Sequence, residues 1–334
     1  MIKEKIGVIG AGSWGTSLAI LLSEKGHDVS LWVYEKDLSE RIKKNRVNDL
    51  YLQGFKIPES VFITTSLKES SDRKDLIVIV VPSHVLRGVL TDLSPFINKK
   101  AILISCTKGI ENDTLLTPSG IMKEVLPEEV HNNLSFLSGP SFALEVAKKL
   151  PTAVSVASYD RDAGLRVQTA FNTPYFRVYT NPDVIGVELG GAIKNVIAIA
   201  SGVSDGLRYG NNARAALITR GLSEISRLGI AMGANPLTFS GLSGLGDLIL
   251  TCTGELSRNR TVGYKLGQGM RLKDILLEMR MVAEGVNTTK AAYRLSRKYN
   301  VEMPITEQVY RLLYENKEPK DVVKDLMTRG LKDE

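Results

Sequence analysis

Short apolar runs alternate with amphipathic stretches along the first half of the chain. Several runs are apolar almost throughout and rich in β-branched residues, which is typical of strands buried on both faces of a parallel sheet. Between them, stretches such as 14–25 and 84–93 have helical patterns that supply crossovers. The pattern predicts an α/β fold with a doubly wound, Rossmann-type parallel sheet. The predicted strands are residues 6–10, 28–33, 76–81, 101–106, 134–137, 153–157 and 176–180.

The strand signal stops after Asn181 and Pro182, and the rest of the chain has helical periodicity. A chain of 334 residues is long for one domain, since a domain commonly holds about 100–200 residues. We therefore expect an α/β domain over residues 1–185 and an all-helical domain over residues 186–334. The predicted helices of the second half are residues 182–203, 212–229, 272–281, 287–299, 305–316 and 319–329.

One lysine lies inside an apolar helical stretch, GGAIKNVIAIA, residues 190–200. Ile193, Val196, Ile197 and Ala200 recur with helical spacing, so most of this helix should be buried. Moving an ammonium group from water into the protein interior is unfavourable by roughly several kcal/mol unless an oppositely charged or hydrogen-bonding partner compensates. Lys194 therefore either extends its stem along apolar surface to water or belongs to a site that needs a buried cation.

Composition and charge exclude several classes of protein. Apolar residues make up 43% of the chain and charged residues 24%, which is ordinary for a soluble globular protein. The net charge is +6, but the chain contains no long block of basic residues, and the densest basic run is Lys43-Lys44-Asn45-Arg46. We read that run as a solvated helix face and expect no nucleic-acid partner, although the basic excess can attract small anionic ligands.

The remaining bulk features point to the cytoplasm. The first residues, MIKEKIGVIG, enter an apolar strand without a signal-peptide pattern. No uninterrupted apolar run approaches the roughly 20 residues that span a bilayer. Two distant cysteines fit a reducing compartment, and the three histidines lack metal-ligand spacing, so we predict no metal site. The cysteines are Cys106 and Cys252, and the histidines are His27, His84 and His131.

The apolar-rich helices of the second half favour a homodimer.

A glycine-rich turn, GAGSWG, follows the first predicted strand and opens a helix. In such a turn Gly10 allows the tight bend, Gly12 lets a pyrophosphate approach the backbone, and Gly15 permits close helix packing. Phosphate then lies on the free N–H groups at the positive end of the helix. The position of the turn predicts a dinucleotide site.

The end of the second strand should contact the adenosine ribose of that dinucleotide, and it reads Tyr34-Glu35-Lys36. Glu35 can accept hydrogen bonds from ribose hydroxyls and favour NAD, whereas Lys36 can pair with a 2′-phosphate and favour NADP. Tyr34 can pack on the adenine. The choice of coenzyme stays open at this point.

Three later loops follow strands of the first half. His84 is either a base or a loop residue, and Lys108 is either a surface lysine or a cation at the carboxyl end of a strand. The segment SGPSFA, residues 138–143, resembles a strand-to-helix turn with Pro140 in the first helical turn. Its free N–H groups either hold a ligand or simply begin a helix.

Two segments of the helical half carry polar groups that fit a site. GLSGLGD, residues 241–247, packs three glycines before Asp247, which is either an N-cap or the partner of a buried cation. Ser257-Arg258-Asn259-Arg260 is a cluster of donors in a predicted loop. Arginine binds phosphate through a bidentate fork, so this loop is either a phosphate site or a solvated turn.

Together these segments resemble the bacterial-type NAD(P)-dependent glycerol-3-phosphate dehydrogenases. The matching blocks run in order from residue 10 to residue 269, and the similarity continues to about residue 330. They are GAGSWGTSLA, VVPSH, TKGIE, SGPSFALEVA, NPDVIGVELGGAIKNVIAIASG, ITRGLSEISRLG, GLSGLGDLILTC, SRNR and GQG. The resemblance implies NAD(P)H-dependent reduction of dihydroxyacetone phosphate to sn-glycerol 3-phosphate, which supplies glycerophospholipid synthesis.

The resemblance also implies roles for individual residues and domains. Residues 1–185 become the dinucleotide-binding domain and residues 186–334 the substrate-binding and catalytic domain. Lys194 becomes the proton donor and acceptor, held charged by Asp247 while Lys108 lowers its pKa. Arg258 and Asn259 are implied to contact the phosphate of the substrate. The full set of implied substrate contacts is Lys108, Gly139, Ser141, Lys194, Asp247, Ser257, Arg258 and Asn259. The implied nucleotide contacts are Ser13, Trp14, Tyr34, Lys108, Ala143, Arg258, Val282 and Glu284, besides the glycine turn.

Two other functions are compatible with parts of the sequence. One is a dehydrogenase of another small phosphorylated substrate or hydroxyacid, for which the SRNR segment favours a phosphorylated substrate. The other is a nucleotide-sensing protein without catalysis, which predicts a missing proton donor although Lys194 and Asp247 are both present.

Overall fold

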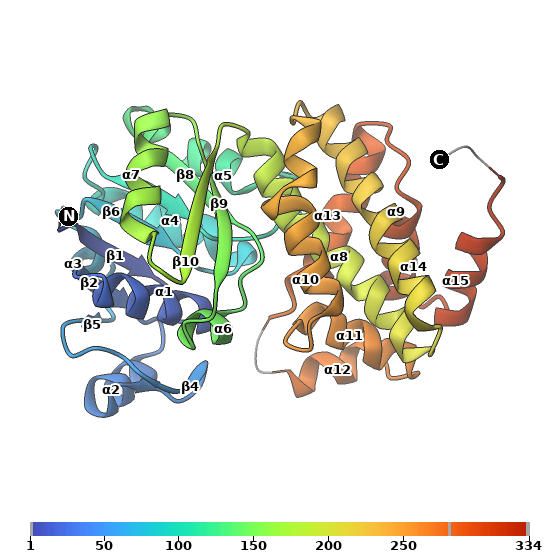
Figure 1. The fold of residues 1–334 in the computed structure, drawn as a ribbon, viewed down its shortest axis with the longest axis horizontal. Helices are drawn as coiled ribbons and strands as arrows, with labels where there is room; N and C mark the ends of the chain where they lie inside the picture. The colour runs from blue at the N-terminus through green and yellow to red at the C-terminus, as the bar shows by residue number, and fades with distance from the viewer. Residues whose placement is uncertain (1–2, 280–281, 332–334) are drawn as a thin grey trace. The chain divides into compact units, whose positions relative to one another are not determined.

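A computed structural model describes residues 3–279 and 282–331. These residues form two compact units (Figure 1). The first unit comprises the chain up to Thr107 together with Pro118–Val187. The second comprises Lys108–Thr117 and the chain from Glu188 onward, so a short segment of the first half groups with the helices.

An eight-stranded sheet forms the centre of the first unit, in the order β10-β9-β8-β7-β6-β1-β2-β5. All seven predicted strands are present, and their apolar side chains are almost entirely buried. The order around β1 is that of a doubly wound dinucleotide fold, which confirms the predicted fold class. The strands are β1 (Lys5–Ile9), β2 (Asp28–Trp32), β5 (Phe62–Thr64), β6 (Leu76–Ile79), β7 (Ile102–Ser105), β8 (Leu134–Ser138), β9 (Thr152–Ser158) and β10 (Phe176–Asn181).

The sheet differs from the prediction in two respects. First, it is mixed, because β9 runs antiparallel to β8. The connection between them contains only the five-residue helix α6 (Ala143–Ala147) rather than a long crossover helix. Second, β5 and the hairpin of β3 (Val47–Asn48) and β4 (Leu52–Lys56) were not predicted, since strands this short have little periodicity.

The first unit also contains helices, several of which pack on the faces of this sheet (Figure 1). Besides α6 they are α1 (Ser13–Glu24), α2 (Lys36–Asn45), α3 (Leu67–Ser71), α4 (Leu86–Leu93), α5 (Pro118–Val125) and α7 (Arg161–Phe171). Helix α1 starts directly after the glycine turn that follows β1. The sequence therefore places the N-terminus of a helix at the carboxyl end of a central strand, which is where this fold binds nucleotides.

The second unit is helical, and no strand occurs among its described residues. Its helices are α8 (Val184–Gly206), α9 (Gly210–Ala231), α10 (Asp247–Thr253), α11 (Arg258–Gly267), α12 (Leu272–Glu278), α13 (Glu284–Lys298), α14 (Pro304–Tyr314) and α15 (Pro319–Met327). All six predicted helices are present, and residues 280 and 281 of one of them lie outside the described residues.

Helix α8 is the core of this unit. By length and composition it is the one helix among the described residues that could cross a membrane, yet 94% of its most apolar window is buried inside the protein. Glycines let α11 pack directly on it. A Cβ on Gly202 would lie 2.0 Å from the carbonyl oxygen of Arg260, and one on Gly263 would lie 1.9 Å from that of Ile199. This close packing fixes the first turn of α11 beside the middle of α8.

Candidate active site

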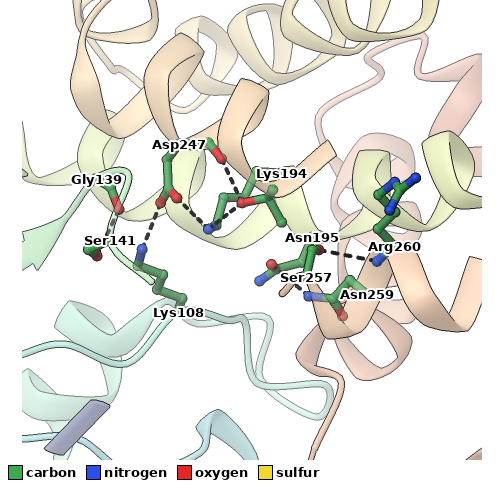
Figure 2. Close-up of polar contacts among 10 residues, drawn as sticks. Lys108, Gly139, Ser141, Lys194, Asn195, Asp247, Ser257, Asn259 and Arg260 are labelled. Carbon is green, nitrogen blue, oxygen red and sulfur yellow. Dashed lines mark hydrogen bonds and ion pairs between the residues drawn. The ribbon is translucent and has the colours of Figure 1, made fainter. Parts of the chain in front are cut away.

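Lys194 lies in the buried middle of α8 with only 7% of its surface exposed. Its Nζ donates to Oδ1 of Asp247 at 2.5 Å and to Oγ1 of Thr251 at 2.8 Å. The ammonium group therefore lies inside the protein, where it is hydrogen-bonded to two side-chain oxygens. The interpretation in which its stem reaches water is wrong, and the predicted pair with Asp247 is present (Figure 2).

Asp247 begins α10, and the three glycines before it explain how it reaches α8. Residues Leu242–Gly246 form one π-helical turn, a feature that often marks functional sites. A Cβ on Gly244 would lie 2.2 Å from the carbonyl oxygen of Phe239, and a Cβ on Gly190 of α8 would lie 2.5 Å from that of Ser243. Only glycines permit this approach of the turn to α8, and it brings Asp247 to the lysine.

A second lysine shares the same carboxylate. Nζ of Lys108 lies 2.7 Å from Oδ2 of Asp247, whose side chain is 1% exposed. The segment Lys108–Thr117 is held to the helices at further points. Thr117 donates to Glu188 of α8 at 2.8 Å, and the carbonyl oxygen of Asn112 accepts from Arg294 of α13. Lys108 is thus a positioned cation rather than a free surface lysine.

Burial and neighbouring charges set the pKa of Lys194. Burial lowers this pKa, the carboxylate of Asp247 raises it, and the ammonium of Lys108 lowers it again, to about 8. A pKa near the working pH lets an amine both give and accept a proton. The group can therefore act as acid and as base.

The Ser257-Arg258-Asn259-Arg260 segment is not the predicted loop, because α11 begins at Arg258. Ser257 is the N-cap, and its Oγ accepts from the backbone N–H of Arg260 at 3.2 Å. Serine is a favoured N-cap because its oxygen satisfies one of the unpaired N–H groups of the first turn. The segment thus combines a helix N-terminus with the cationic side chain of Arg258, an exposed residue, and both attract anions.

Two asparagines join α11 to α8. Nδ2 of Asn259 donates to Oδ1 of Asn195 at 2.8 Å, and Oδ1 of Asn259 accepts from the backbone N–H of Gly285 at 2.9 Å. Asn195 follows Lys194 directly, so this bond places the start of α11 beside the lysine. Asn195 and Thr251 were not predicted. Thr251 follows Asp247 by four residues on one helix, and this i, i+4 spacing was a usable signal. Asn195 had no signal except that it follows Lys194 directly.

An ion triad around the buried carboxylate of Asp205 anchors the same turn. Oδ2 of Asp205, near the end of α8, accepts from Nε of Arg260 at 2.8 Å. Its Oδ1 accepts from Nε and Nη2 of Arg214 of α9 at 2.9 and 2.6 Å. The side chain of Asp205 is 5% exposed, so the triad holds α8, α9 and α11 together at fixed distances.

In the first unit the glycine turn fits a dinucleotide. Gly10 has φ +116°, and a Cβ there would lie 2.6 Å from the carbonyl oxygen of Val80. A Cβ on Gly12 would meet nothing within 4 Å, so the turn is open where a pyrophosphate approaches. A Cβ on Gly15 would lie 1.9 Å from the carbonyl oxygen of Gly10. Ser13 begins α1, whose N-cap Gly12 offers no side-chain cap and leaves the first N–H groups for a ligand.

The other predicted nucleotide contacts of this unit lie near the ends of strands. Trp14 is half-buried against Phe176, with ring centroids 6.3 Å apart. Tyr34 follows β2 and is 77% exposed, with its ring edge-on to Trp32. Ala143 is the first residue of α6 and its carbonyl oxygen accepts from Ser17 of α1 at 2.6 Å.

The turn after β8 differs from its prediction. Helix α6 begins at Ala143 with Phe142 as N-cap, so Pro140 precedes the helix instead of lying in its first turn. Gly139 has φ +141°, and a Cβ there would lie 2.9 Å from Cα of Val154. Ser141 is half-buried, and its Oγ donates to the carbonyl oxygen of Gly139 at 3.1 Å. His84 is exposed.

The last two predicted nucleotide contacts belong to the second unit. Val282 is 37% exposed, and Glu284 begins α13. Although Arg258 reaches solvent, the protein around its guanidinium lowers the pKa of Arg258, and the carboxylate of Glu284 opposes that shift. The guanidinium remains charged in either case. Within this unit the structure brings together Lys108, Lys194 and Asp247, with the Ser257–Asn259 turn joined to α8 through Asn195 (Figure 2).

Two family models match most of the chain, and both describe NAD-dependent glycerol-3-phosphate dehydrogenase. The profile of the NAD-dependent glycerol-3-phosphate dehydrogenase N-terminus matches residues 5–164, and that of the C-terminus matches residues 183–324. The chain is 58% identical over 333 residues to the glycerol-3-phosphate dehydrogenase (NAD(P)+) of Geobacter sulfurreducens, covering 100% of this chain and 99% of that relative. It is 52% identical to the enzyme of the same name from Leptospira biflexa, with 99% of each chain covered. The crystal structure of glycerol-3-phosphate dehydrogenase from Coxiella burnetii is similar with a TM-score of 0.93 and 42% identity, covering 98% of this chain and 99% of that one.

Proposed function

The chain belongs to the NAD-dependent glycerol-3-phosphate dehydrogenase family, and from that premise we propose how its residues catalyse the reaction. The enzyme reduces dihydroxyacetone phosphate to sn-glycerol 3-phosphate with NADH or NADPH, reversibly. Its product is the backbone of glycerophospholipids.

The proposal for the chemical step depends on the shared carboxylate of Asp247. When bound, the reduced nicotinamide supplies a hydride to the carbonyl carbon of the substrate. Lys194 gives its proton to the carbonyl oxygen, which otherwise becomes an unstabilised alkoxide. Asp247 keeps Lys194 charged and aimed, while Lys108 lowers its pKa toward the working pH. In the reverse direction neutral Lys194 accepts the proton from the alcohol.

The substrate phosphate is proposed to bind at the start of α11. Arg258 offers a bidentate fork, and the first N–H groups of the helix point along a favourable dipole. Asn259 contributes through its backbone N–H, because its side-chain amide already bonds Asn195 and Gly285. Ser257 caps the turn, and Gly139 and Ser141 are carried over from the family as further substrate contacts.

The coenzyme is proposed to bind at the glycine turn of the first unit. Gly10, Gly12 and Gly15 form the turn, and the free N–H groups after Gly12 hold the pyrophosphate. The other proposed contacts come from the family resemblance: Ser13, Trp14, Tyr34, Lys108, Ala143, Arg258, Val282 and Glu284.

Loss of NADH or NADPH absorbance with dihydroxyacetone phosphate tests the function directly. The matched control is unphosphorylated dihydroxyacetone, which lacks the group that Arg258 would bind. We expect turnover that is strongly selective for the phosphorylated ketone. Comparable turnover of both ketones, or preferred turnover of a hydroxyacid's keto form, would favour the alternative dehydrogenase.

We propose that the enzyme is a cytoplasmic homodimer. Exposed apolar side chains of the second unit support a homodimer: Ile230, Leu237 and Ile249. Light scattering coupled to gel filtration tests this, with a monomeric mass over the micromolar range as the contradicting result. Cys106 and Cys252 are buried and form no disulfide with each other, which supports a reducing compartment such as the cytoplasm.

A further inference from the structure

The unpredicted β3–β4 hairpin is tied to the glycine turn by one asparagine. Asn48 is completely buried. Its Nδ2 donates to the carbonyl oxygen of Ala11 at 2.8 Å and to Oγ1 of Thr16 at 2.9 Å. Its Oδ1 accepts from the backbone N–H of Tyr51 at 3.0 Å. The loop between the two strands is therefore fixed relative to the turn that binds the pyrophosphate.

Tyr51 of that loop reaches the end of β2. Its hydroxyl donates to Oε1 of Glu35 at 2.8 Å. Glu35 lies between β2 and α2 and is only half-exposed. It follows Gly15 by about 20 residues, the spacing at which an acidic residue of dinucleotide folds accepts from the ribose hydroxyls. Lys36 beside it is exposed and begins α2.

We propose that Tyr51 is a specificity-determining residue that fixes the carboxylate of Glu35 at the adenosine ribose and thereby favours NADH over NADPH. The inference rests on the proposed coenzyme site. A fixed carboxylate accepts from the 2′- and 3′-hydroxyls of NADH without loss of side-chain entropy on binding. The same charge repels a 2′-phosphate. A mobile carboxylate can rotate away, and Lys36 can then pair with the phosphate.

The Tyr51 hydroxyl can donate its hydrogen bond to Glu35 only while it is protonated. Burial and the carboxylate of Glu35 raise the pKa of Tyr51 to about 12. Its hydroxyl therefore stays protonated across the working pH range, and the restraint on Glu35 does not depend on pH in that range.

Tyr51→Phe removes only this hydroxyl. We expect the wild-type enzyme to prefer NADH by less than about a hundredfold. The variant should lose about three- to tenfold of that preference, which is the usual net effect of one hydrogen bond. The dissociation constants of NADH and NADPH are measured by fluorescence titration without substrate, followed by kcat/KM with dihydroxyacetone phosphate. Tyr179→Phe is the control, because this exposed tyrosine lies on β10 at the opposite edge of the sheet.

A double-mutant cycle separates this role from general damage to the hairpin. In a Glu35→Ala background, Tyr51→Phe should not change the ratio of the two dissociation constants further. Equal weakening of both coenzymes by Tyr51→Phe, an unchanged ratio, or a full effect without Glu35 would each overturn the inference. Failure of the wild type to bind either coenzyme would instead refute the proposed function.

Discussion

The ammonium of Lys194 and the carboxylate of Asp247 form a buried ion pair, with Nζ 2.5 Å from Oδ1. Lys108 occupies the other carboxylate oxygen at 2.7 Å. Two ammonium groups on one carboxylate leave an excess of positive charge in a buried place. Such an excess is unfavourable in a protein interior unless a negative charge arrives, and a developing alkoxide supplies one.

Replacing Lys194 with Met tests the acid directly. Met keeps the helix and approximate side-chain length but removes the charge and the transferable proton. We expect kcat to fall by about 10²–10⁴-fold, the usual range for a general acid. Fluorescence titration without substrate should give a coenzyme dissociation constant within a few-fold of wild type. A folded variant that turns over within tenfold of wild type would contradict the assignment.

The pH dependence should follow Lys194, whose pKa is about 8. Reduction needs the protonated amine, so kcat/KM for dihydroxyacetone phosphate should fall as the pH rises through about 8. Oxidation of glycerol 3-phosphate needs the neutral amine and should rise over the same interval.

Two variants should move this profile in opposite directions. Lys108→Met removes a charge that lowers the pKa of Lys194, so the falling limb should move to higher pH. Asp247→Asn removes the charge that raises it, so the limb should move to lower pH. Both variants will also be slower, and the informative quantity is the position of the limb. Unmoved limbs would show that another group sets the profile.

The fold was largely predictable because buried strands and helices have distinct periodicities. The direction of β9 was not, since a strand has the same pattern in either direction. The Lys194–Asp247 pair was predictable from the requirement that a buried cation has a partner. The SRNR segment was misread as a loop, although Ser257 has the side chain of an N-cap. The roles of Asn195 and Asp205 depend on packing between distant helices, which glycines such as Gly263 permit.

Asp205 should act on substrate binding through Arg260. Asp205→Asn and Arg260→Gln loosen the first turn of α11, so KM for dihydroxyacetone phosphate should rise about three- to tenfold, while coenzyme affinity changes little. Arg214→Gln removes the other half of the same triad and is the matched control. It should lower the midpoint of thermal unfolding but leave KM unchanged. If all three variants change stability alone, the triad is merely structural.

Glu224 should make the stability of the enzyme depend on pH. From α9 it accepts the backbone N–H groups of Ile305 and Thr306, at 2.5 and 3.1 Å, and so caps α14. Burial raises the pKa of Glu224 to about 7, and these hydrogen bonds oppose the shift. A carboxyl group whose folded pKa is raised contributes stability that is fully present below its unfolded pKa and lost as the pH rises through about 7.

Glu224→Gln cannot ionise and should lack this dependence. Between pH 5 and pH 8, the free energy of unfolding of the wild type should fall relative to the variant by on the order of 2 kcal/mol. Urea unfolding at several pH values measures the difference, in which the other titrating groups cancel. A constant difference over this interval would show that Glu224 ionises normally in the folded protein.

Arg258 should decide between phosphorylated and unphosphorylated substrates. Lysine keeps the positive charge but loses the planar fork that bonds two phosphate oxygens at once. Arg258→Lys should therefore raise KM for dihydroxyacetone phosphate about ten- to a hundredfold, while the poor turnover of dihydroxyacetone changes little. Arg271→Lys is the control, since Arg271 is an exposed arginine of the same unit that precedes α12. Because Arg258 is also a proposed nucleotide contact, coenzyme affinity is measured separately by fluorescence titration. If both ketones lose the same factor and coenzyme binding weakens in parallel, Arg258 serves the nucleotide alone, and the phosphate must be held elsewhere.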